Sequence, residues 1–309
     1  MLLALPLWLA LALRLPVPTR AAPALDQRSS TTLADGRSYQ SGAVSSTLRW
    51  QSSGVLVHGG CAAEVGIRDC YTMSLSASGD LQTTSASSSS KRSTTLDDLA
   101  ASDDDDLDAY DRAYPDFETA MYGGEAELVE KRQLVLRNCS DGGGGPPPSP
   151  RQRIELLTWP GAAAGSVWRY EWKSRTSDTS TSSHFFHMWQ LLRRDACGGP
   201  VVTLDLKGGQ AAINDPLRGC SYCRSVPASS WTDRTISHTL LVKYGLSGSL
   251  RYAAHDAGLG LAAPPLLEYA AKGDMGAKSS LKVGSYRAAV EGMREVTTWV
   301  GDLSATRLL

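Results

Sequence analysis

The chain has 309 residues, a formal net charge of −1 and 42% hydrophobic residues. This length is sufficient for one large domain or two small ones. The net charge gives no indication of nucleic-acid binding, so we exclude nucleic acids as partners.

Residues 1–22 predict a secretory signal peptide. The apolar run in "MLLALPLWLALALRLPVPTRAAPA" is too short to span a membrane comfortably, and it gives way to small residues, with cleavage expected near Ala21 or Ala22. No later stretch of the sequence is long and apolar enough to cross a bilayer. We therefore expect a secreted, extracellular protein without a membrane partner.

The cysteine content agrees with an oxidising compartment, and the six residues are Cys61, Cys70, Cys139, Cys197, Cys220 and Cys223. Six cysteines allow fifteen pairings, so the sequence does not define the connectivity. Cys61–Cys70 and Cys220–Cys223 are the nearest candidate pairs. For the second pair we expect a local disulfide rather than half of a zinc site, because no second CxxC is present. Asn138, in "NCS", is a candidate glycosylation site.

Residues 23–132 are predicted to form an N-terminal region that differs from the rest. The segment "SASSSSKRSTTLDDLAASDDDDLDAYD" predicts a disordered acidic linker, and it lacks the ligand spacing and the turn glycine of a calcium loop. Lys91-Arg92 and Lys131-Arg132 are candidate processing sites. Ahead of this linker, "STLRW", "GVLVHG" and "YTMSLSASG" have the composition of strands and are expected to add edge strands.

Residues 133–309 are predicted to form an all-β domain, and its strand-like segments follow the loop "DGGGGPPPSP". The strand-like segments are "RIELLTW", "SVWRYEWKSR", "HFFHMWQLL", "PVVTLDLKG", "ISHTLLVKYG", "SLRYAAH", "PLLEYAAKG" and "SLKVGSYRAAV". Most are rich in aromatic or β-branched residues, and residues 153–156 and 202–207 alternate with period two. Many short strands predict a jelly roll, or concanavalin A-like sandwich, with a disordered acidic insertion.

Three of these strands carry unusual side chains on the face opposite the expected core. In "RIELLTW", Arg153 and Glu155 share that face if Ile154 and Leu156 are buried. They form either a cross-strand surface pair or an arginine that is held by a carboxylate and directed at an anionic ligand.

The second strand is "SSHFFHMWQLL", residues 182–192. Strict alternation divides it into a face with His184, Phe186, Met188 and Gln190 and a face with Phe185, His187 and Trp189. The first face is a plausible core. The second offers an imidazole between two aromatic rings, which suits stacking on a sugar; the alternative is a hydrogen-bonded histidine in a partly buried strand.

The third strand is "SLKVGSYRA", in which Lys282, Gly284 and Tyr286 share one face. The glycine leaves a bare patch between two functional groups, where a ligand can approach the backbone. The alternative is an exposed strand with an ordinary lysine and tyrosine.

Together the three segments resemble the jelly-roll polysaccharide lyases of the alginate lyase type. The matching motifs are "RIEL" at 153–156, "HFFHMWQ" at 184–190 and "KVGSY" at 282–286, in that order. The likeness is greatest to fungal secreted glucuronan lyase-like proteins, in which a segment like "SSHFFHMWQ" is followed by "GGPVVTLD", as at 198–205 here. The resemblance covers residues 151–309.

The resemblance implies cleavage of an acidic polysaccharide, a β-1,4-linked polyuronate and first of all glucuronan, by β-elimination. Tyr286 matches the family tyrosine and is implied as the base and then the acid. An unperturbed tyrosine titrates near about 10, so a cation is needed beside it, and Lys282 or Arg153 is expected to supply that charge.

The same resemblance implies that His187 or His184 assists proton abstraction or binds the substrate carboxylate, and that Gln190 hydrogen-bonds this carboxylate. Trp189 and Glu155 are expected to take part in substrate binding. One departure leaves the active histidine open, because the alginate lyase pattern has Gln two residues before His, where this chain has Phe185. Either a bulge brings His187 and Gln190 onto one face, or only one set lines the cleft.

Members of this group often carry a structural calcium, for which Asp302 is a conceivable ligand, and no organic cofactor is expected. We expect a monomer. The alternative function is a non-catalytic, lectin-like carbohydrate-binding sandwich. A glycoside hydrolase is disfavoured because no E-x-D-x-x-E stretch is present.

Overall fold

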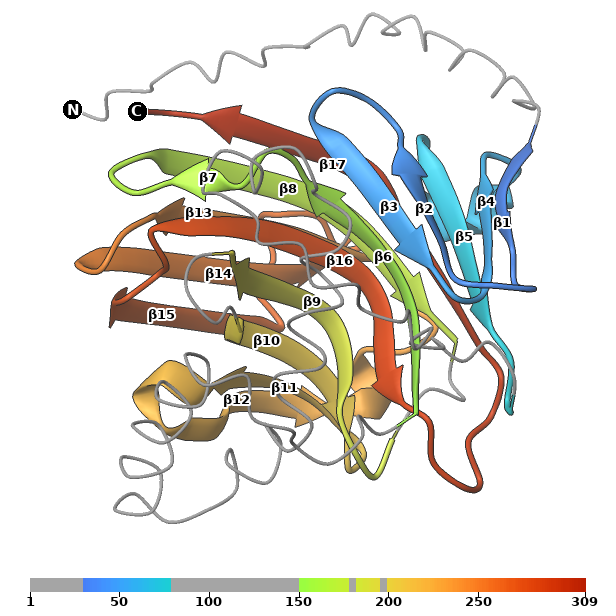
Figure 1. The fold of residues 1–309 in the computed structure, drawn as a ribbon. Coiled ribbons are helices and arrows are strands. Elements are labelled where there is room, and N and C mark those ends of the chain that lie inside the picture. Colours follow the sequence, from blue (N-terminus) through green and yellow to red (C-terminus); the bar gives the residue numbers. More distant parts are fainter. Residues whose placement is uncertain (1–29, 79–149, 178–181, 195–198) are drawn as a thin grey trace, which may run out of the picture.

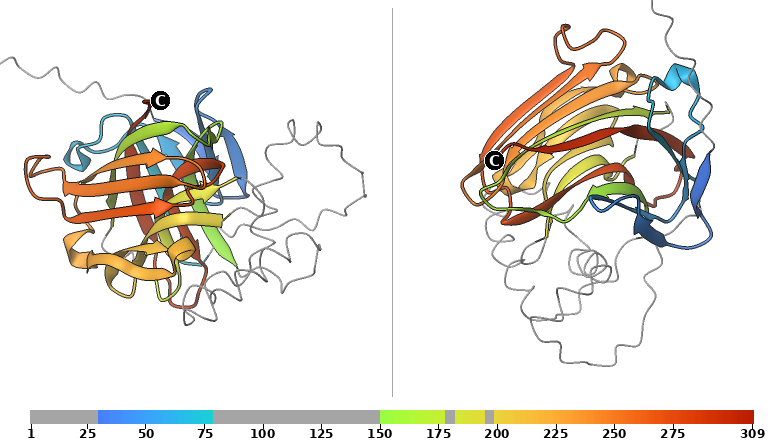
Figure 2. Two further views of the ribbon diagram at one scale, coloured as in Figure 1. Left: turned by 90° about the vertical axis from the view of Figure 1, so that its left-hand side faces the viewer. Right: turned by 90° about the horizontal axis from the view of Figure 1, so that it is seen from above.

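The computed structural model describes residues 30–78, 150–177, 182–194 and 199–309, whose strands form two antiparallel sheets packed face to face (Figure 1, Figure 2). The eight-stranded sheet contains, in spatial order, β1 (Thr31–Asp35), β4 (Val55–His58), β5 (Cys70–Leu75), β17 (Val296–Arg307), β8 (Val167–Thr176), β13 (Ile236–Lys243), β14 (Gly248–Asp256) and β15 (Leu267–Gly273). The nine-stranded sheet contains β12 (Cys220–Pro227), β11 (Gln210–Asp215), β10 (Gly199–Lys207), β9 (Phe186–Arg193), β16 (Lys278–Ala288), β6 (Arg151–Thr158), β3 (Leu48–Ser52) and β2 (Gln40–Ala43), with β7 (Ala162–Ala163) beside β16. The predicted all-β sandwich is confirmed.

The central strands of the eight-stranded sheet have one face in the core and one facing outward. On β8, Tyr170 and Trp172 are buried, whereas Glu171 between them is exposed. β13 alternates in the same way. Since successive strand residues point to opposite faces, this pattern places a single apolar layer between the two sheets.

The centre of the nine-stranded sheet is buried on both faces. All eight residues of β6 and seven of the eight in β9 are buried. Ile154 and Leu156 pack into the core between the sheets, so Arg153 and Glu155 lie on the opposite face of β6. We call this opposite face, formed by β3, β6, β16, β9, β10 and β11, the outer face. Figure 1 shows that β6, β16 and β9, at the centre of this sheet, curve together.

The strands before the acidic segment belong to the same sandwich. β3 pairs with β6, and β5 lies between β4 and β17 rather than at an edge. Figure 1 shows these N-terminal strands together at one end of both sheets. Residues 31–75 therefore complete the two sheets, and the predicted boundary at residues 132 and 133 lies outside the described residues.

The sequence does not predict β11, β12 or β17, nor the short strands β1, β2 and β7. β17 is central and has 12 residues, but its pairing with β8 shifts between Gly301 and Ser304, where the glycine and Asp302 interrupt the strand-like composition. β11 is short and contains two alanines, and β12 holds the CxxC segment.

The two disulfides Cys61–Cys70 and Cys220–Cys223 confirm the two nearest predicted pairs. The signal peptide, the acidic linker, Asn138 and the two dibasic pairs lie outside the described residues. The helices in the described ranges are single 3-10 turns, and none is long and apolar enough to cross a membrane.

Candidate functional site

A bulge in β9 decides which of its side chains share a face. His187 and Trp189 pair with residues that are adjacent on β10, so β9 has one extra residue at this point. Met188 and Trp189, although adjacent, both lie in the core. Alternation is therefore reversed past the bulge, and His187 and Gln190 both lie on the outer face. Of the two arrangements considered from the sequence, the bulge is the one that the structure contains.

Trp189 and His184 lie away from His187. The Trp189 ring is 6.2 Å from that of Trp172 and 4.8 Å from that of Tyr252, measured between centroids, inside the core. The prediction that Trp189 shares a face with His187 and contacts a sugar is therefore wrong, because strict alternation does not hold across a bulge. His184 precedes β9 and is exposed, with its Nδ1 3.1 Å from Ser183 Oγ.

Glu155 is the centre of a buried polar cluster on the outer face. Two cations and two amides converge on its carboxylate: Lys282 Nζ at 3.4 Å, Arg153 Nε at 3.3 Å, Gln51 Nε2 at 3.0 Å and Gln190 Nε2 at 2.7 Å. Burial alone would raise the pKa of this carboxyl, but these cations and donors hold it below its ordinary value. Glu155 thus orients its neighbours, and any effect on a substrate acts through them.

Tyr286 lies beside this cluster, between two arginines. Arg151 Nη1 donates to the Tyr286 hydroxyl oxygen at 2.6 Å. The Arg153 guanidinium carbon lies 4.0 Å from the centroid of the tyrosine ring, a cation–π distance. The sequence suggests Lys282 or Arg153 as the cation for this tyrosine. The structure places Arg153, one of these two expected cations, over the ring, and it places Arg151, for which no role was predicted, on the oxygen.

His187 completes the group around Tyr286. Its ring centroid lies 5.6 Å from that of Tyr286, and Phe185 lies 4.9 Å from each of them. His187 Nδ1 is 2.5 Å from Asp205 Oδ1 on β10. The sequence carries a signal for Asp205, a lone carboxylate within the largely apolar residues 200–206, but no role was predicted for it.

Gly284 serves strand packing, contrary to the expectation of a bare patch for a ligand. Its φ is +147°, and a Cβ atom would lie 2.2 Å from the Ile154 carbonyl oxygen of β6. The absence of a side chain therefore lets β16 approach β6 closely, which keeps Tyr286 opposite Arg153.

Asp302 does not fit a calcium site. Its Oδ1 accepts from the backbone N–H groups of Arg68 and Asp69 at 3.0 Å, and its Oδ2 is 2.9 Å from Lys173 Nζ. These donors hold the pKa of Asp302 below its ordinary value, although its partial burial acts in the opposite direction. A cation at this carboxylate would meet the lysine ammonium, and within the described ranges no group of three or more His, Cys, Asp or Glu could hold a metal ion.

A groove of about 660 Å³ lies on the outward face of the eight-stranded sheet, around Lys173, Ser237, Thr239 and Asp302. Its charged groups include two ion pairs, Lys173–Asp302 and Arg234–Asp256. Of the predicted site residues only Asp302 lies there, whereas the cluster around Glu155 and Tyr286 is on the other sheet.

Neither a protein-family model nor a curated protein matches this chain. Similar solved structures include an endo-β-1,4-glucuronan lyase from the fungus Trichoderma reesei, 12% identical over 50% of this chain and 74% of its own, with a TM-score of 0.36. An alginate lyase of polysaccharide lyase family 7 is 14% identical over 53% of this chain and 75% of its own, with a TM-score of 0.39. An alginate lyase from Alteromonas sp. 272 is 10% identical over 50% and 79%, with a TM-score of 0.35. Similarities this distant carry no argument about activity, so function must be inferred from this chain's own side chains.

Proposed function

We propose that the protein is an extracellular polysaccharide lyase that cleaves a β-1,4-linked polyuronate by β-elimination, with glucuronan as the first substrate to test. The observation that carries this proposal is the contact of 2.6 Å between Arg151 Nη1 and the Tyr286 hydroxyl oxygen, with His187 beside the same ring. A guanidinium that donates to a phenolic oxygen stabilises the phenolate, which is the form that can accept a proton.

A lyase site must meet three chemical demands. It neutralises the carboxylate on C5 so that the C5 hydrogen becomes acidic, it removes that proton, and it protonates the departing O4. The outer face offers Arg153 and Lys282 as fixed cations for the first demand and Gln190 as an amide that can contact the same carboxylate. Tyr286 and His187 are the groups that can exchange protons.

In the proposed reaction, Tyr286 acts on one face of the sugar. In β-1,4-glucuronan the C5 hydrogen and O4 leave from the same face, so one side chain can reach both. The phenolate takes the C5 proton, the electron pair forms the C4–C5 double bond, and the C4–O4 bond breaks. The phenol then returns its proton to O4, which restores the phenolate held by Arg151. His187 assists the proton transfer.

The side chains of the proposed site are buried in this structure. Tyr286 is 4% exposed and His187 is 6% exposed. Contact with a polymer therefore requires a state of the outer face in which these side chains are more exposed.

The experiment is an absorbance assay for unsaturated products. Purified protein is incubated with glucuronan, polymannuronate, polyguluronate and a neutral β-1,4-glucan, and the ultraviolet absorbance of the C4–C5 double bond is recorded. We expect an increase with a polyuronate and none with the neutral glucan. If no polyuronate gives the signal while glycan binding is measurable, the protein is a carbohydrate-binding module and the lyase proposal is wrong.

A further inference from the structure

Asp205 is a buried carboxylate behind the histidine of the proposed site. It lies on β10, is 0% exposed, and its Oδ1 is 2.5 Å from His187 Nδ1. A buried carboxylate is destabilising unless hydrogen bonds or an opposite charge offset the loss of its hydration. The partners of Asp205 therefore indicate what the group is for.

The second oxygen of Asp205 is held from β11. Asn214 Nδ2 donates to Asp205 Oδ2 at 2.9 Å, and the Asn214 amide oxygen in turn accepts from the backbone N–H of Tyr222 at 2.9 Å. Tyr222 has a positive φ of 52°, where the pairing of β12 with β11 shifts register. The irregular backbone thus directs an N–H group at the side chain of Asn214.

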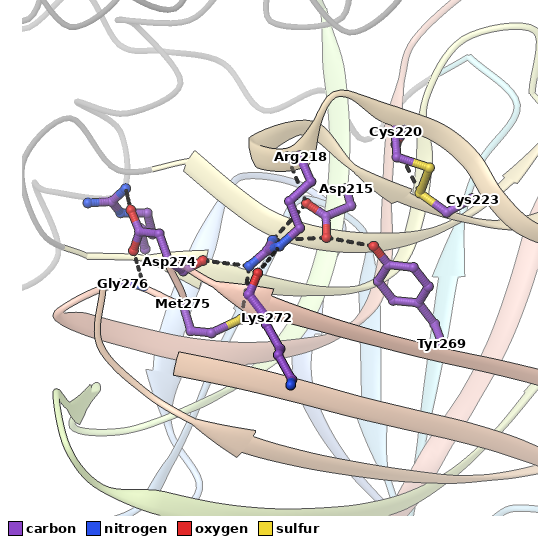
Figure 3. A network of polar contacts seen from close by, with 10 residues as sticks. Asp215, Arg218, Cys220, Cys223, Tyr269, Lys272, Asp274, Met275 and Gly276 are labelled. Carbon is purple, nitrogen blue, oxygen red and sulfur yellow. Dashed lines mark hydrogen bonds and ion pairs between the residues drawn. A yellow bond between two sulfur atoms is a disulfide. The ribbon is translucent and has the colours of Figure 1, made fainter. Parts of the chain in front are cut away.

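The end of β11 is fixed by a second network next to Asn214 (Figure 3). Arg218 Nη1 lies 2.8 Å from Asp215 Oδ1, and the Tyr269 hydroxyl donates to Asp215 Oδ2 at 2.8 Å. Arg218 also donates to the carbonyl oxygens of Lys272 and Asp274, which ties the turn after β11 to β15 of the other sheet. Asn214 therefore projects from a backbone that both sheets hold in place.

These contacts determine how the imidazole is used. A carboxylate on Nδ1 holds the proton there, so Nε2 becomes the nitrogen that exchanges a proton with a ligand. It also stabilises the imidazolium that forms after proton uptake. We propose that Asp205, supported by Asn214, is a positioning residue that holds His187 in the Nδ1–H tautomer with its ring beside Tyr286. Its effect on catalysis rests on the proposed lyase function, but the tautomer does not.

The other charges near His187 do not explain this geometry. Arg151 and Arg153 on β6 and Lys282 on β16 face the same cluster, where they contact Tyr286 and Glu155. All three are cations, which disfavour a protonated imidazole nearby. Among the described residues, Asp205 is the carboxylate that contacts His187 directly.

The test is nitrogen-15 NMR of the histidine rings in the full-length protein, with the His187 signals assigned from their loss in His187→Gln. In the wild type we expect the proton on Nδ1. Asp205→Asn replaces the acceptor with an amide that donates to Nδ1, so we expect the proton to move to Nε2. Asp205→Ser removes the carboxylate without adding volume, and there we expect a mixture of tautomers.

Thr203→Val is the matched control. Thr203 lies two residues before Asp205 on β10, is equally buried, and its hydroxyl makes no hydrogen bond within the described residues. This variant should retain the wild-type tautomer. A wild-type His187 with its proton on Nε2, or an unchanged tautomer in folded Asp205→Asn, would overturn the proposal.

A kinetic readout separates this proposal from the proposed function. If a polyuronate is cleaved, Asp205→Asn should lower kcat by about 10-fold to 10²-fold, no more than the loss of His187 itself, with little change in KM, and Thr203→Val should not. An unchanged kcat in an active enzyme would overturn the positioning role. If no polyuronate is cleaved, the lyase proposal fails while the NMR result still decides the tautomer.

Discussion

Two buried histidines of this protein have opposite surroundings. His238 lies in the core, stacked on Trp172 at 4.6 Å, with Ser174 Oγ and the Tyr252 hydroxyl each 2.8 Å from its ring nitrogens. Burial lowers its pKa to about 3, so it is neutral in the folded protein. His187 lies on the outer face, and its Nδ1 meets the Asp205 carboxylate.

The difference lies in the partners rather than in burial. Hydroxyl groups satisfy the hydrogen bonds of a neutral imidazole but do not balance a charge, so His238 serves packing. A carboxylate can balance the charge of an imidazolium, and Tyr286 and Arg151 lie in the same cluster. The type of partner therefore separates a structural histidine from one that is suited to proton transfer.

One tyrosine lies beside each histidine, Tyr286 beside His187 and Tyr252 beside His238, and the largest effect is expected at Tyr286. Tyr286→Phe should lower kcat on a cleaved polyuronate by about 10³-fold or more, because it removes both the base and the acid. Tyr252→Phe, its matched control, should leave kcat within about twofold and lower the free energy of unfolding by about 1 kcal/mol, since it removes one hydrogen bond to His238. Full activity in folded Tyr286→Phe would exclude the proposed mechanism.

Exchanging the histidines themselves should separate activity from stability. His187→Gln should lower kcat by about 10²-fold with a small change in thermal stability. His238→Leu should retain kcat but destabilise the fold by about 2 kcal/mol, because the hydroxyls of Ser174 and Tyr252 lose their partner inside the core. Kinetics and chemical denaturation measure the two effects, and a catalytic defect in His238→Leu would contradict the distinction between the two sites.

His238 should also make the stability of the fold depend on pH in the acid range. His238 binds a proton in the unfolded chain at its ordinary pKa of 6.5 but in the folded protein only at about 3. The stability that it contributes is therefore lost as the pH falls from about 6.5 towards 3, by up to about 1.4 kcal/mol per pH unit. Urea denaturation at several pH values should show this slope in the wild type and a flatter curve in His238→Leu. The pKa of Glu155 is also lowered, so its stabilising effect is complete above its ordinary pKa of 4.5 and is lost only below that value. It therefore adds no slope above pH 5, and an unchanged slope above pH 5 in His238→Leu would contradict the assignment to His238.

The smallest expected effect concerns Asp302, a carboxylate that lies away from the proposed site, in contrast to Asp205. Asp302 pairs with Lys173 and two backbone amides on the partly exposed outward face of the eight-stranded sheet. Asp302→Asn should therefore cost at most about 1 kcal/mol of stability and leave activity unchanged. Calcium should not raise the melting temperature of the wild type more than that of Asp302→Asn, and a rise confined to the wild type would show that Asp302 binds the ion.

Much of the fold follows from local sequence pattern. Alternation in residues 153–156 and 202–207 identifies β6 and β10, and it places Arg153, Glu155 and Asp205 on the polar face. The close spacing of Cys61 and Cys70 identifies their disulfide. Period-two alternation is a property of neighbouring residues, so it can be recognised without knowing which strands pair.

Period-two alternation fails in the stretch "SSHFFHMWQLL", because β9 contains a bulge there. The residue pattern predicts the all-β sandwich, and the resemblance to polysaccharide lyases points to His187, Gln190, Lys282 and Tyr286. Strand pairing in the folded protein, by contrast, places a bulge in β9 that puts Trp189 in the core and Gln190 beside Glu155. It also decided that Arg151 meets Tyr286 and that Asp205 meets His187. These contacts depend on strand pairing and register between segments far apart in the chain, and a local pattern of side chains does not encode them.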